Sequence, residues 1–327
     1  MPEVPFDMEM SILEASGLKC PVCKGAAWTV SDESALCLSC AVTYPFDDGV
    51  LRMDGGQKDP TSEFYATLGA SHFVDATFAE NPVIHCTTRR YRLFVDEQFP
   101  KANGSLLDFG CGDGRLSLWA AEKGFSPVVA IDSNLASLKS LVAKGRHCGL
   151  SNLLVISCNV TNPPFAKNHF DAVLCFEVLY YLVLSLGRIP ALALPHSLLK
   201  PGGVLVLSEM SRYGRSLVDL TAMDMTNVRA LVESGTRWEK SNTDRLEVFQ
   251  WSPAELKSDC QQLGLQIMRE SGVSPIAGIF DFAWKFTSYP LRPVLDQRLQ
   301  RIIEELDEQT SEACNLARNI LLALKKT

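Results

Sequence analysis

The segment Leu106–Arg115 carries the densest set of residues that could contact a ligand. An apolar run there reaches Asp108 and is followed by Gly110, Gly112 and Gly114. Glycine lets a backbone approach a ligand closely and adopt positive φ, and the helix expected next presents free N–H groups at its start. The G-x-G-x-G spacing differs from the G-x-G-x-x-G of dinucleotide-binding turns, and the acid before it would repel a pyrophosphate. These residues therefore favour a cationic ligand.

Polar side chains also end the apolar runs that follow this loop. Asp132 closes the second run, where a carboxylate can accept hydrogen bonds from both hydroxyls of a ribose. Asn159 ends the third run and Glu177 follows the fourth. In an open sheet of parallel strands, ligands bind outside the carboxyl ends of the strands. We therefore expect these side chains and the glycine loop to line one crevice.

Four cysteines near the N-terminus form two C-x-x-C pairs, Cys20 with Cys23 and Cys37 with Cys40. Thiolates at this spacing can surround one Zn²⁺ tetrahedrally, and the metal then supplies folding free energy that so short a segment cannot gain from burial. The alternatives are a chance pattern or a redox dithiol, but a redox site needs only one pair. Four thiolates close the coordination shell, so the predicted metal is structural.

The elements that must position these residues follow from a second pattern. Short apolar runs alternate with helical stretches, which is typical of a parallel sheet covered by helices on both faces. We predict strands near 105–109, 127–131, 153–158, 170–176 and 203–209, a helix and a strand at 253–263 and 265–270, and a last strand near 319–324. The predicted fold class is α/β, a Rossmann-like, doubly wound sheet of seven strands.

The remaining segments define the predicted domains. Residues 1–53 are expected to form a small zinc ribbon, residues 54–62 a polar linker, and residues 63–327 the domain that holds the sheet. Two insertions, at about 211–252 and 272–318, are expected to be helical and to cover the strand ends. Substrate selection should reside there, because loops over the strand ends form the lid of such a site.

The charge of the chain argues against a protein that grips nucleic acid. Its 327 residues include 31 Lys and Arg against 38 Asp and Glu, a net charge of −7, and residues 1–60 hold ten acids and four bases. Binding to many phosphates normally requires a basic surface. The N-terminus does not resemble a secretory signal, the most apolar stretch is short for a bilayer, and the cysteines suggest no disulfide framework. We expect a cytoplasmic protein without a membrane partner.

Together the sheet motifs resemble the class I S-adenosylmethionine-dependent methyltransferases, over about residues 64–271 plus the final strand. "LDFGCGDGRL" is similar to their first motif, "AIDSN" to their second, "FDAVLCFEVLYYL" to the region of their fourth and "LKPGGVLVLSE" to the segment that enters strand five. The resemblance implies S-adenosylmethionine as the cofactor. The implied cofactor-binding residues are Asp108, Gly110, Cys111, Gly112, Gly114, Asp132, Ser133, Asn159, Val160 and Phe176.

The resemblance also implies what these residues contact. The glycines would lie against the methionine moiety, with Asp108 near its ammonium group, and Asp132 would hold the ribose hydroxyls. Asn159 would face the adenine amino group, and the Val160 amide would face a ring nitrogen. The family more often has Asp at the position of Asn159, whose amide oxygen can also accept a hydrogen bond.

The predicted catalytic residues are Glu177, Tyr180 and Tyr181, which follow the fourth strand near the expected methyl group. Methyl transfer needs mainly alignment of the nucleophile, the methyl group and the sulfur, and a base only where the acceptor starts protonated. Glu177 could be that base. The alternatives are that Glu177 contacts the cofactor or caps a helix, and that the tyrosines belong to the core.

The cysteine segment and its tail, "TYPFDDGVL", resemble the small zinc-ribbon protein that activates several tRNA and protein methyltransferases, over about residues 15–53. Zinc-ribbon fusions of this order also resemble the ribosomal RNA guanine methyltransferases of bacteria. Three functions therefore stay open. They are methylation of a small molecule (a metabolite, glycan or natural-product intermediate), methylation of RNA, and non-catalytic cofactor binding. The acidic charge and the insertions favour the first, with the ribbon as a structural brace or a protein-docking piece.

Overall fold

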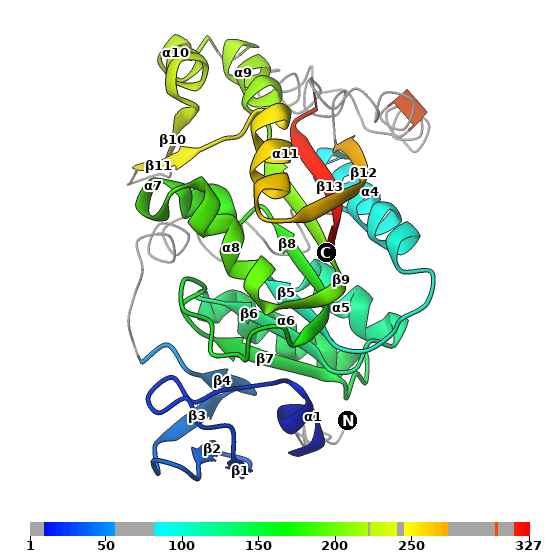
Figure 1. Cartoon of the computed structure of the whole chain (residues 1–327), viewed down its shortest axis with the longest axis vertical. Coiled ribbons are helices and arrows are strands. Elements are labelled where there is room, and N and C mark those ends of the chain that lie inside the picture. The colour runs from blue at the N-terminus through cyan, green and yellow to red at the C-terminus, as the bar shows by residue number, and fades with distance from the viewer. Residues whose placement is uncertain (1–9, 56–81, 222, 241–244, 274–304, 307–316) are drawn as a thin grey trace, which may run out of the picture.

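The computed structural model of the chain describes residues 10–55, 82–221, 223–240, 245–273, 305–306 and 317–327. They form one large mixed sheet with helices on both faces and a separate two-stranded hairpin (Figure 1). The eleven strands of the large sheet lie in the order β1-β2-β3-β4-β7-β6-β5-β8-β9-β13-β12. The strands are β1 Trp28–Val30, β2 Ser34–Cys37, β3 Thr43–Asp47, β4 Val50–Arg52, β5 Leu106–Phe109, β6 Val128–Asp132, β7 Leu153–Ser157, β8 Phe170–Phe176, β9 Leu199–Met210, β10 Thr236–Lys240, β11 Arg245–Phe249, β12 Leu265–Val273 and β13 Asn319–Lys326.

All seven predicted strands are present, as β5 to β9, β12 and β13. Strands β7, β6, β5, β8 and β9 run parallel, and β13 lies antiparallel between β9 and β12. The predicted size of the sheet is wrong, because β1–β4 extend it beyond β7 to eleven strands. Strand β4 pairs in parallel with β7, with Leu51 opposite Ile156. Pairing between strands about a hundred residues apart leaves no local pattern, so the sequence did not indicate it.

A tight hairpin brings β4 to this edge. The loop between β3 and β4 contains only Asp48 and Gly49. Their φ angles are 53° and 88°, both positive, as a type I′ hairpin turn requires, and Asp-Gly is a favoured pair for that turn. Lys139 forms an ion pair with Asp48 at 2.8 Å, which links the hairpin to helix α6 (Leu135–His147). The N-terminal strands are thus held to the larger part of the molecule by backbone and side-chain bonds.

Helices cover both faces of the sheet, as a doubly wound fold requires. Buried residues of α4, α5 and α6 pack on one face, and those of α1, α8 and α11 pack on the other. Adjacent residues of β5 belong to opposite cores, Leu106 to the first and Leu107 to the second, as the pleat dictates. The helices are α1 Met10–Ala15, α4 Pro82–Gln98, α5 Arg115–Lys123, α6 Leu135–His147, the 3₁₀ turn η2 Leu179–Tyr181, α7 Val183–Leu186, α8 Arg188–Leu198, α9 Arg212–Thr221, α10 Met225–Ser234 and α11 Pro253–Gln262.

The insertion predicted at 211–252 is only partly helical. It contains α9 and α10, but also the antiparallel hairpin of β10 and β11. Most of the second insertion, 272–318, and most of the predicted linker, 54–62, lie outside the described residues. Figure 1 shows α9 and α10 at the opposite end of the molecule from β1–β4.

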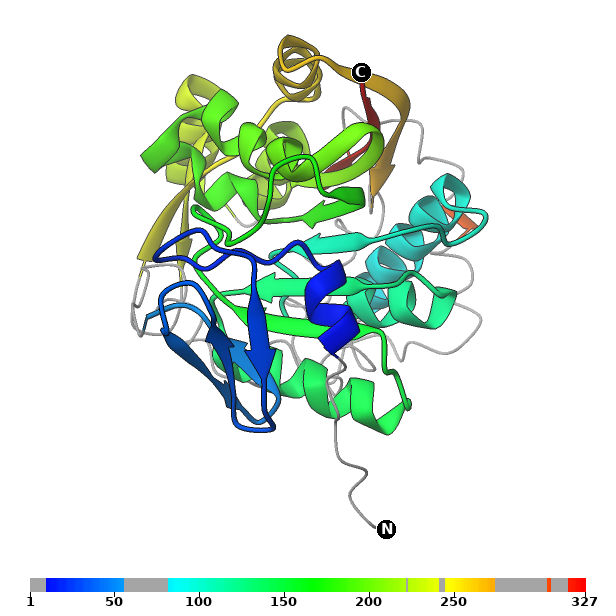
Figure 2. The same ribbon diagram turned by 60° about the horizontal axis from the view of Figure 1, so that its bottom comes forward.

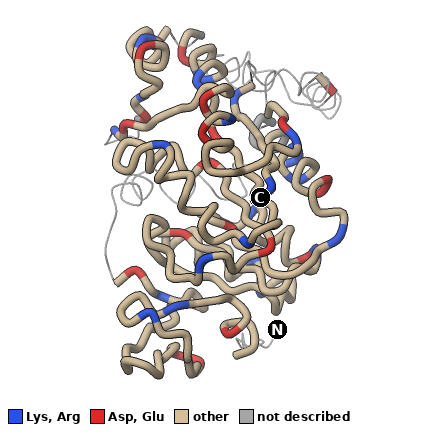
Figure 3. Tube along the Cα trace, in the orientation of Figure 1, with Lys and Arg blue, Asp and Glu red and all other residues tan. Residues whose placement is uncertain are grey.

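Figure 2 shows the N-terminal helix and strands, in blue, beside the green edge of the sheet. Acidic and basic residues are interspersed along the described trace (Figure 3). Among the described residues, no helix combines the length and the apolar character needed to cross a bilayer.

Candidate active site

The loops that follow β5, β6 and β8 lie at one edge of the sheet. Phe109, the last residue of β5, is opposite Ile131 of β6 and Cys175 of β8. Because the three strands are parallel and β5 is the middle one, the glycine loop lies between the loops that begin at Asp132 and Glu177. The fold therefore brings together side chains that are far apart in the chain.

Two glycines of the loop are required by close packing. Gly110 has a φ of 75°, and a Cβ added to it would lie 2.3 Å from Val178 Cγ2. Gly114 has a φ of 84°, and a Cβ added to it would lie 2.1 Å from Leu141 Cδ1. A side chain would be strained in this left-handed region as well as obstructed. At Gly112, an added Cβ would have no described atom within 4 Å. The middle glycine thus leaves open space at the sheet edge.

Asp132 joins the end of the second strand to the glycine loop. Its Oδ2 accepts a hydrogen bond from the Gly112 amide at 2.9 Å, and its Oδ1 accepts one from the Asn134 amide at 2.8 Å. Asn134 in turn caps α6 by accepting from the Ser137 amide at 3.1 Å. A carboxylate offers about four acceptor positions, so these bonds are compatible with further bonds to ribose hydroxyls.

Asp108 is a buried carboxylate beneath the same loop. Only 3% of the residue is exposed, and its Oδ2 accepts a hydrogen bond from Ser117 Oγ at 2.5 Å. Burial raises the pKa of Asp108 to about 6. The Ser117 hydrogen bond opposes this shift, and the nearby Asp132 carboxylate adds to it. Two mutually repelling carboxylates at one strand edge would be stabilised by a cationic group between them.

Four other predicted cofactor residues surround this edge. The Cys111 amide donates to the β6 backbone at 2.9 Å, and Ser133 directly follows the strand. Phe176 ends β8 and contacts Tyr91 edge to face, with ring centroids 4.8 Å apart. Val160 is partly buried against the core on one face of the sheet. Each of these residues lies at or just after the carboxyl end of β5, β6, β7 or β8.

Asn159 is exposed and engages its own turn. Its Oδ1 accepts hydrogen bonds from the amide of Thr161 at 2.9 Å and from the Thr161 hydroxyl at 2.8 Å. Both lone pairs of the amide oxygen are therefore occupied. An adenine amino group that used this oxygen would have to displace Thr161.

Asp54 is a further acid at the carboxyl ends of the parallel strands, and the sequence analysis did not identify it. It follows β4, and its Oδ2 accepts from Ser157 Oγ at 3.0 Å while Arg52 binds the same oxygen at 3.0 Å. The chain offered a signal, since a short apolar run there ends in an acid followed by two glycines, but the acid fell in the predicted linker. It lies beside the strand end expected to face adenine.

Glu177 is held by side chains from two other elements, and a third element supports one of them. Its Oε1 accepts a hydrogen bond from the Tyr91 hydroxyl at 2.5 Å and one from Asn319 Nδ2 at 3.2 Å. Ser208 donates to the same Tyr91 oxygen at 3.0 Å. Burial, followed by the Glu177 charge, raises the pKa of Tyr91 well above its ordinary value, so the phenol stays a donor. Sequence analysis assigned no role to Tyr91 or Asn319, because neither lies in a recognisable motif.

The alternative that Glu177 caps a helix is not what the structure shows. Glu209 performs that function, accepting from the amides of Leu179 at 3.0 Å and Tyr180 at 3.2 Å. Burial raises the pKa of Glu209 to about 8. Since Glu177 is spared from capping, its Oε2 makes no hydrogen bond within the described part of the chain.

The two predicted tyrosines lie in contact with each other. Their rings are 3.9 Å apart between centroids, and the Tyr180 hydroxyl donates to that of Tyr181. The Tyr181 hydroxyl donates in turn to Glu239 Oε2 of β10 at 3.2 Å. Tyr180 is only 2% exposed. The pair thus connects the end of β8 to the inserted hairpin.

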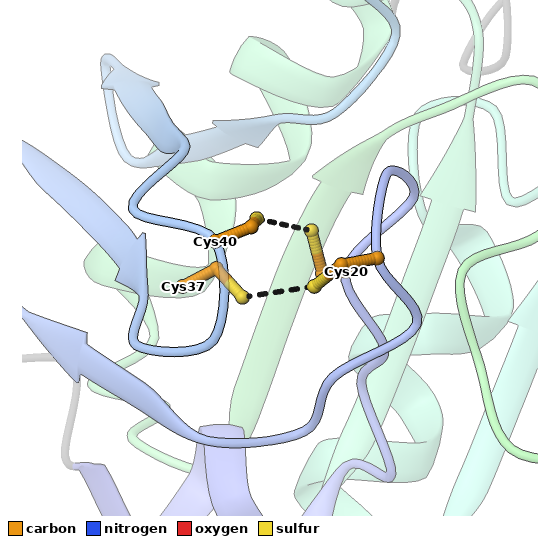
Figure 4. A group of neighbouring side chains, drawn as sticks. Cys20, Cys37 and Cys40 are labelled. Atoms are coloured by element: carbon orange, nitrogen blue, oxygen red, sulfur yellow. Dashed lines mark hydrogen bonds between the residues drawn. The ribbon is translucent and has the colours of Figure 1, made fainter.

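The four N-terminal cysteines form a compact cluster. Their sulfur atoms all lie within 4.8 Å of one another, and the Cys20–Cys40 and Cys23–Cys37 pairs are each 3.6 Å apart (Figure 4). Tetrahedral zinc with Zn–S bonds of about 2.3 Å separates its sulfurs by about 3.8 Å, so the geometry fits this metal. Tyr44 Oη lies 3.2 Å from Cys20 Sγ, where a phenol can donate to a thiolate ligand.

Comparison with known proteins is consistent with this geometry. A family model described as a methyltransferase domain matches residues 83–270, which include the glycine loop and both strand-end acids. The ubiquinone biosynthesis O-methyltransferase of Marinobacter nauticus is 27% identical over 217 residues, covering 64% of this chain and 84% of that protein. The enzyme of the same name from Xanthomonas axonopodis pv. citri is 30% identical over 208 residues, covering 62% and 80%.

A solved structure shows the same fold. A Listeria monocytogenes protein assigned as an S-adenosylmethionine-dependent methyltransferase superposes with a TM-score of 0.50 at 14% identity, covering 72% of this chain and 97% of that one. The range of the family model includes the parallel strands β5 to β9 and the helices between them, and leaves the cysteine cluster outside.

Proposed function

The chain belongs to the methyltransferase-domain family and is an S-adenosylmethionine-dependent methyltransferase, and from this premise we propose that it methylates a hydroxyl oxygen of a small molecule. The main support for methyl transfer is that the match to the family model includes the glycine loop, Asp108 and Asp132. The relatives named above are O-methyltransferases of ubiquinone biosynthesis, which supports both the oxygen acceptor and the small substrate. They lend no support to the RNA alternative.

We assign the cofactor's contacts to the edge described above. Asp132 holds the ribose hydroxyls while its bonds to Gly112 and Asn134 keep the loop in place. Asp108 faces the ammonium of the methionine moiety, whose positive charge offsets the repulsion between the two carboxylates. When bound, S-adenosylmethionine supplies the electrophilic methyl group, and the protein aligns the acceptor and excludes water.

Glu177 is the proposed general base. Tyr91 and Asn319 both bind Oε1, which leaves Oε2 for the acceptor's proton. Tyr180 and Tyr181 shape the acceptor side of the site through their link to β10. A hydroxyl acceptor starts protonated, so a base at this position would accelerate transfer by the usual 10²–10⁴-fold, as an order of magnitude.

The N-terminal segment is proposed to be a zinc ribbon that braces the sheet. Cys20, Cys23, Cys37 and Cys40 would bind one structural Zn²⁺, because their sulfurs match a tetrahedral shell. Thiolate ligation needs reduced cysteines, which agrees with the cytoplasmic location that the sequence favours. The ribbon would bind zinc and the other domain S-adenosylmethionine, so we propose them as two domains. Their strands nevertheless join one sheet, because β4 pairs with β7.

Transfer of radiolabel from the cofactor into fractionated cell extract tests the substrate class. We expect label in the small-molecule fraction with the wild-type protein and none with Asp132→Ala. Counts in RNA would overturn the proposed substrate class. Calorimetry with S-adenosylhomocysteine is the parallel control, and wild-type affinity retained by Asp132→Ala would reject the ribose contact.

A further inference from the structure

Three arginines from separate elements converge near the proposed acceptor site. Arg215 lies on α9, Arg237 on β10 and Arg318 just before β13. The backbone of α9 is pressed against that of residues 317–318, since a Cβ on Gly214 would lie 2.0 Å from Ala317 O and 2.9 Å from Arg318 Cα. The convergence is therefore set by backbone packing.

Among the described residues, only Arg237 of these three forms ion pairs. Arg237 makes a two-point ion pair with Asp219, with Nε–Oδ2 at 2.7 Å and Nη2–Oδ1 at 3.0 Å, and lies 3.6 Å from Glu239. Within the described chain, the Nε atoms of Arg215 and Arg318 are buried and have no hydrogen-bond partner. A buried charged donor without an acceptor is unfavourable, so an anion that accepted from both Nε–H groups would be stabilising.

The electrostatics of Arg215 agree with this geometry. Burial, followed by the charges of Arg237 and Arg318, lowers the pKa of Arg215 to about 10. The carboxylates of Glu239 and Asp219 oppose the shift without reversing it. The cluster therefore keeps an excess of positive charge, and Arg215 and Arg318 each retain partial exposure.

The cluster adjoins the groups proposed to act on the acceptor. Arg318 precedes Asn319, which donates to Glu177 Oε1 at 3.2 Å. Glu239, beside Arg237, accepts from the Tyr181 hydroxyl at 3.2 Å. The charge of Arg237 also interacts with Tyr180. An anion bound by the arginines would therefore adjoin the tyrosine pair.

We propose that Arg215 and Arg318 bind an anionic group, a carboxylate or a phosphate, of the methyl acceptor, so that the substrate is a small hydroxylated anion. Arg237, already paired with Asp219, holds the hairpin and α9 together around that group. That the anion belongs to the methyl acceptor rests on the proposed function. Binding of an anion to the arginines does not, and it can be measured separately.

The test is calorimetric titration with phenyl phosphate, benzoate and neutral benzyl alcohol at constant ionic strength, with and without S-adenosylhomocysteine. We expect one or both anions to bind the wild-type protein at least tenfold more tightly than the alcohol. Their affinity should fall tenfold or more in Arg215→Gln and in Arg318→Gln, with Arg215→Lys between, because a charge-assisted bond is lost. Stronger binding of phenyl phosphate would identify a phosphate-bearing substrate, and stronger binding of benzoate a carboxylate-bearing one.

Arg229→Gln is the matched control, because it removes the same charge from an exposed side chain of the neighbouring helix α10. Equal binding of the alcohol and the anions, or equal losses in Arg229→Gln and Arg215→Gln, would overturn the proposal. Binding of S-adenosylhomocysteine should be unchanged in all these variants. If the wild-type protein failed to bind S-adenosylhomocysteine while the anion results held, the proposed function would be wrong and the anion site would stand.

Discussion

Three carboxylates at the carboxyl ends of the parallel strands differ in what surrounds them, and those differences support the separate role proposed for each. Asp132 is bound by two backbone amides, which suits a group that must hold a loop and a ribose. Asp108 is buried and accepts hydrogen bonds from the hydroxyl and the backbone amide of Ser117, and its raised pKa suits a partner for a cation. Glu177 has one oxygen fixed by Tyr91 and Asn319, and its other oxygen makes no hydrogen bond to the described residues, which suits the proposed proton transfer.

The environment of Asp108 predicts a pH dependence of cofactor affinity. Burial raises the pKa of Asp108 from 3.8 to about 6. In the free protein, protonation of this carboxyl therefore contributes folding stability that is fully present below about pH 4 and is lost as the pH rises through 6. A cationic ligand requires the ionised form. The Kd of S-adenosylhomocysteine should therefore rise about tenfold from pH 7 to pH 5, as calorimetry would show. Asp108→Asn should flatten the profile, and an equally steep profile in that variant would refute the assignment.

The surroundings of Glu177 predict a loss of rate without a loss of cofactor binding. Glu177→Gln keeps the shape and can still accept from Tyr91, but cannot take a proton. We expect kcat to fall about 10²–10³-fold and the Kd of S-adenosylhomocysteine to change less than threefold. Tyr91→Phe, which removes one donor to Oε1, should give a smaller fall and shift the pH–rate profile. A large rise in Kd in Glu177→Gln would instead identify a cofactor contact.

At the scale of elements, the site depends on how tightly the glycine loop is packed between β5 and α6. Gly114 is the N-cap residue of α5, has a left-handed φ, and packs against Leu141 of α6. Because Leu141 is fully buried, it has little freedom to move away from an added methyl group. The start of α5, and the N–H groups that it presents, are thus positioned by contact with α6.

Gly114→Ala should lower the free energy of unfolding by about 2–4 kcal/mol, combining left-handed strain with overpacking. Gly149→Ala is the matched control, since Gly149 also has positive φ, 67°, but no described atom lies within 4 Å of its added Cβ. That variant should lose only about 1 kcal/mol. Denaturant unfolding measures both values. Equal losses would mean that the Leu141 contact contributes nothing.

At the scale of the whole molecule, the sheet connects two regions with different chemistry. The cysteine cluster and β1–β4 lie at one end, and α9, α10 and the arginine cluster belong to the other (Figure 1). Because β4 pairs with β7 and leads to Asp54, the N-terminal segment also lies beside the strand end that is proposed to face adenine. Its integrity should therefore matter for the cofactor as well as for stability.

Loss of zinc should therefore affect both properties. In Cys23→Ser, we expect the bound zinc to fall from one ion per chain to none, Tm to drop by about 5 °C or more, and the affinity for S-adenosylhomocysteine to fall at least threefold. Elemental analysis, thermal unfolding and calorimetry measure these changes. Cys148→Ser, at another exposed cysteine, should change none of them. Full zinc occupancy in Cys23→Ser would contradict the four-cysteine site.

Local pattern alone determined the seven sheet strands, the doubly wound class, the glycine loop with Asp108 and Asp132, and the four cysteines, because each depends on the types and spacing of residues close in the chain. The tertiary structure alone decided the β4–β7 pairing, the Tyr91 and Asn319 bonds to Glu177, the capping by Glu209, and the meeting of Arg215 with Arg318. Those contacts join segments tens to hundreds of residues apart. Their energies depend on the packing of the folded chain, and no short stretch of sequence carries a mark of them.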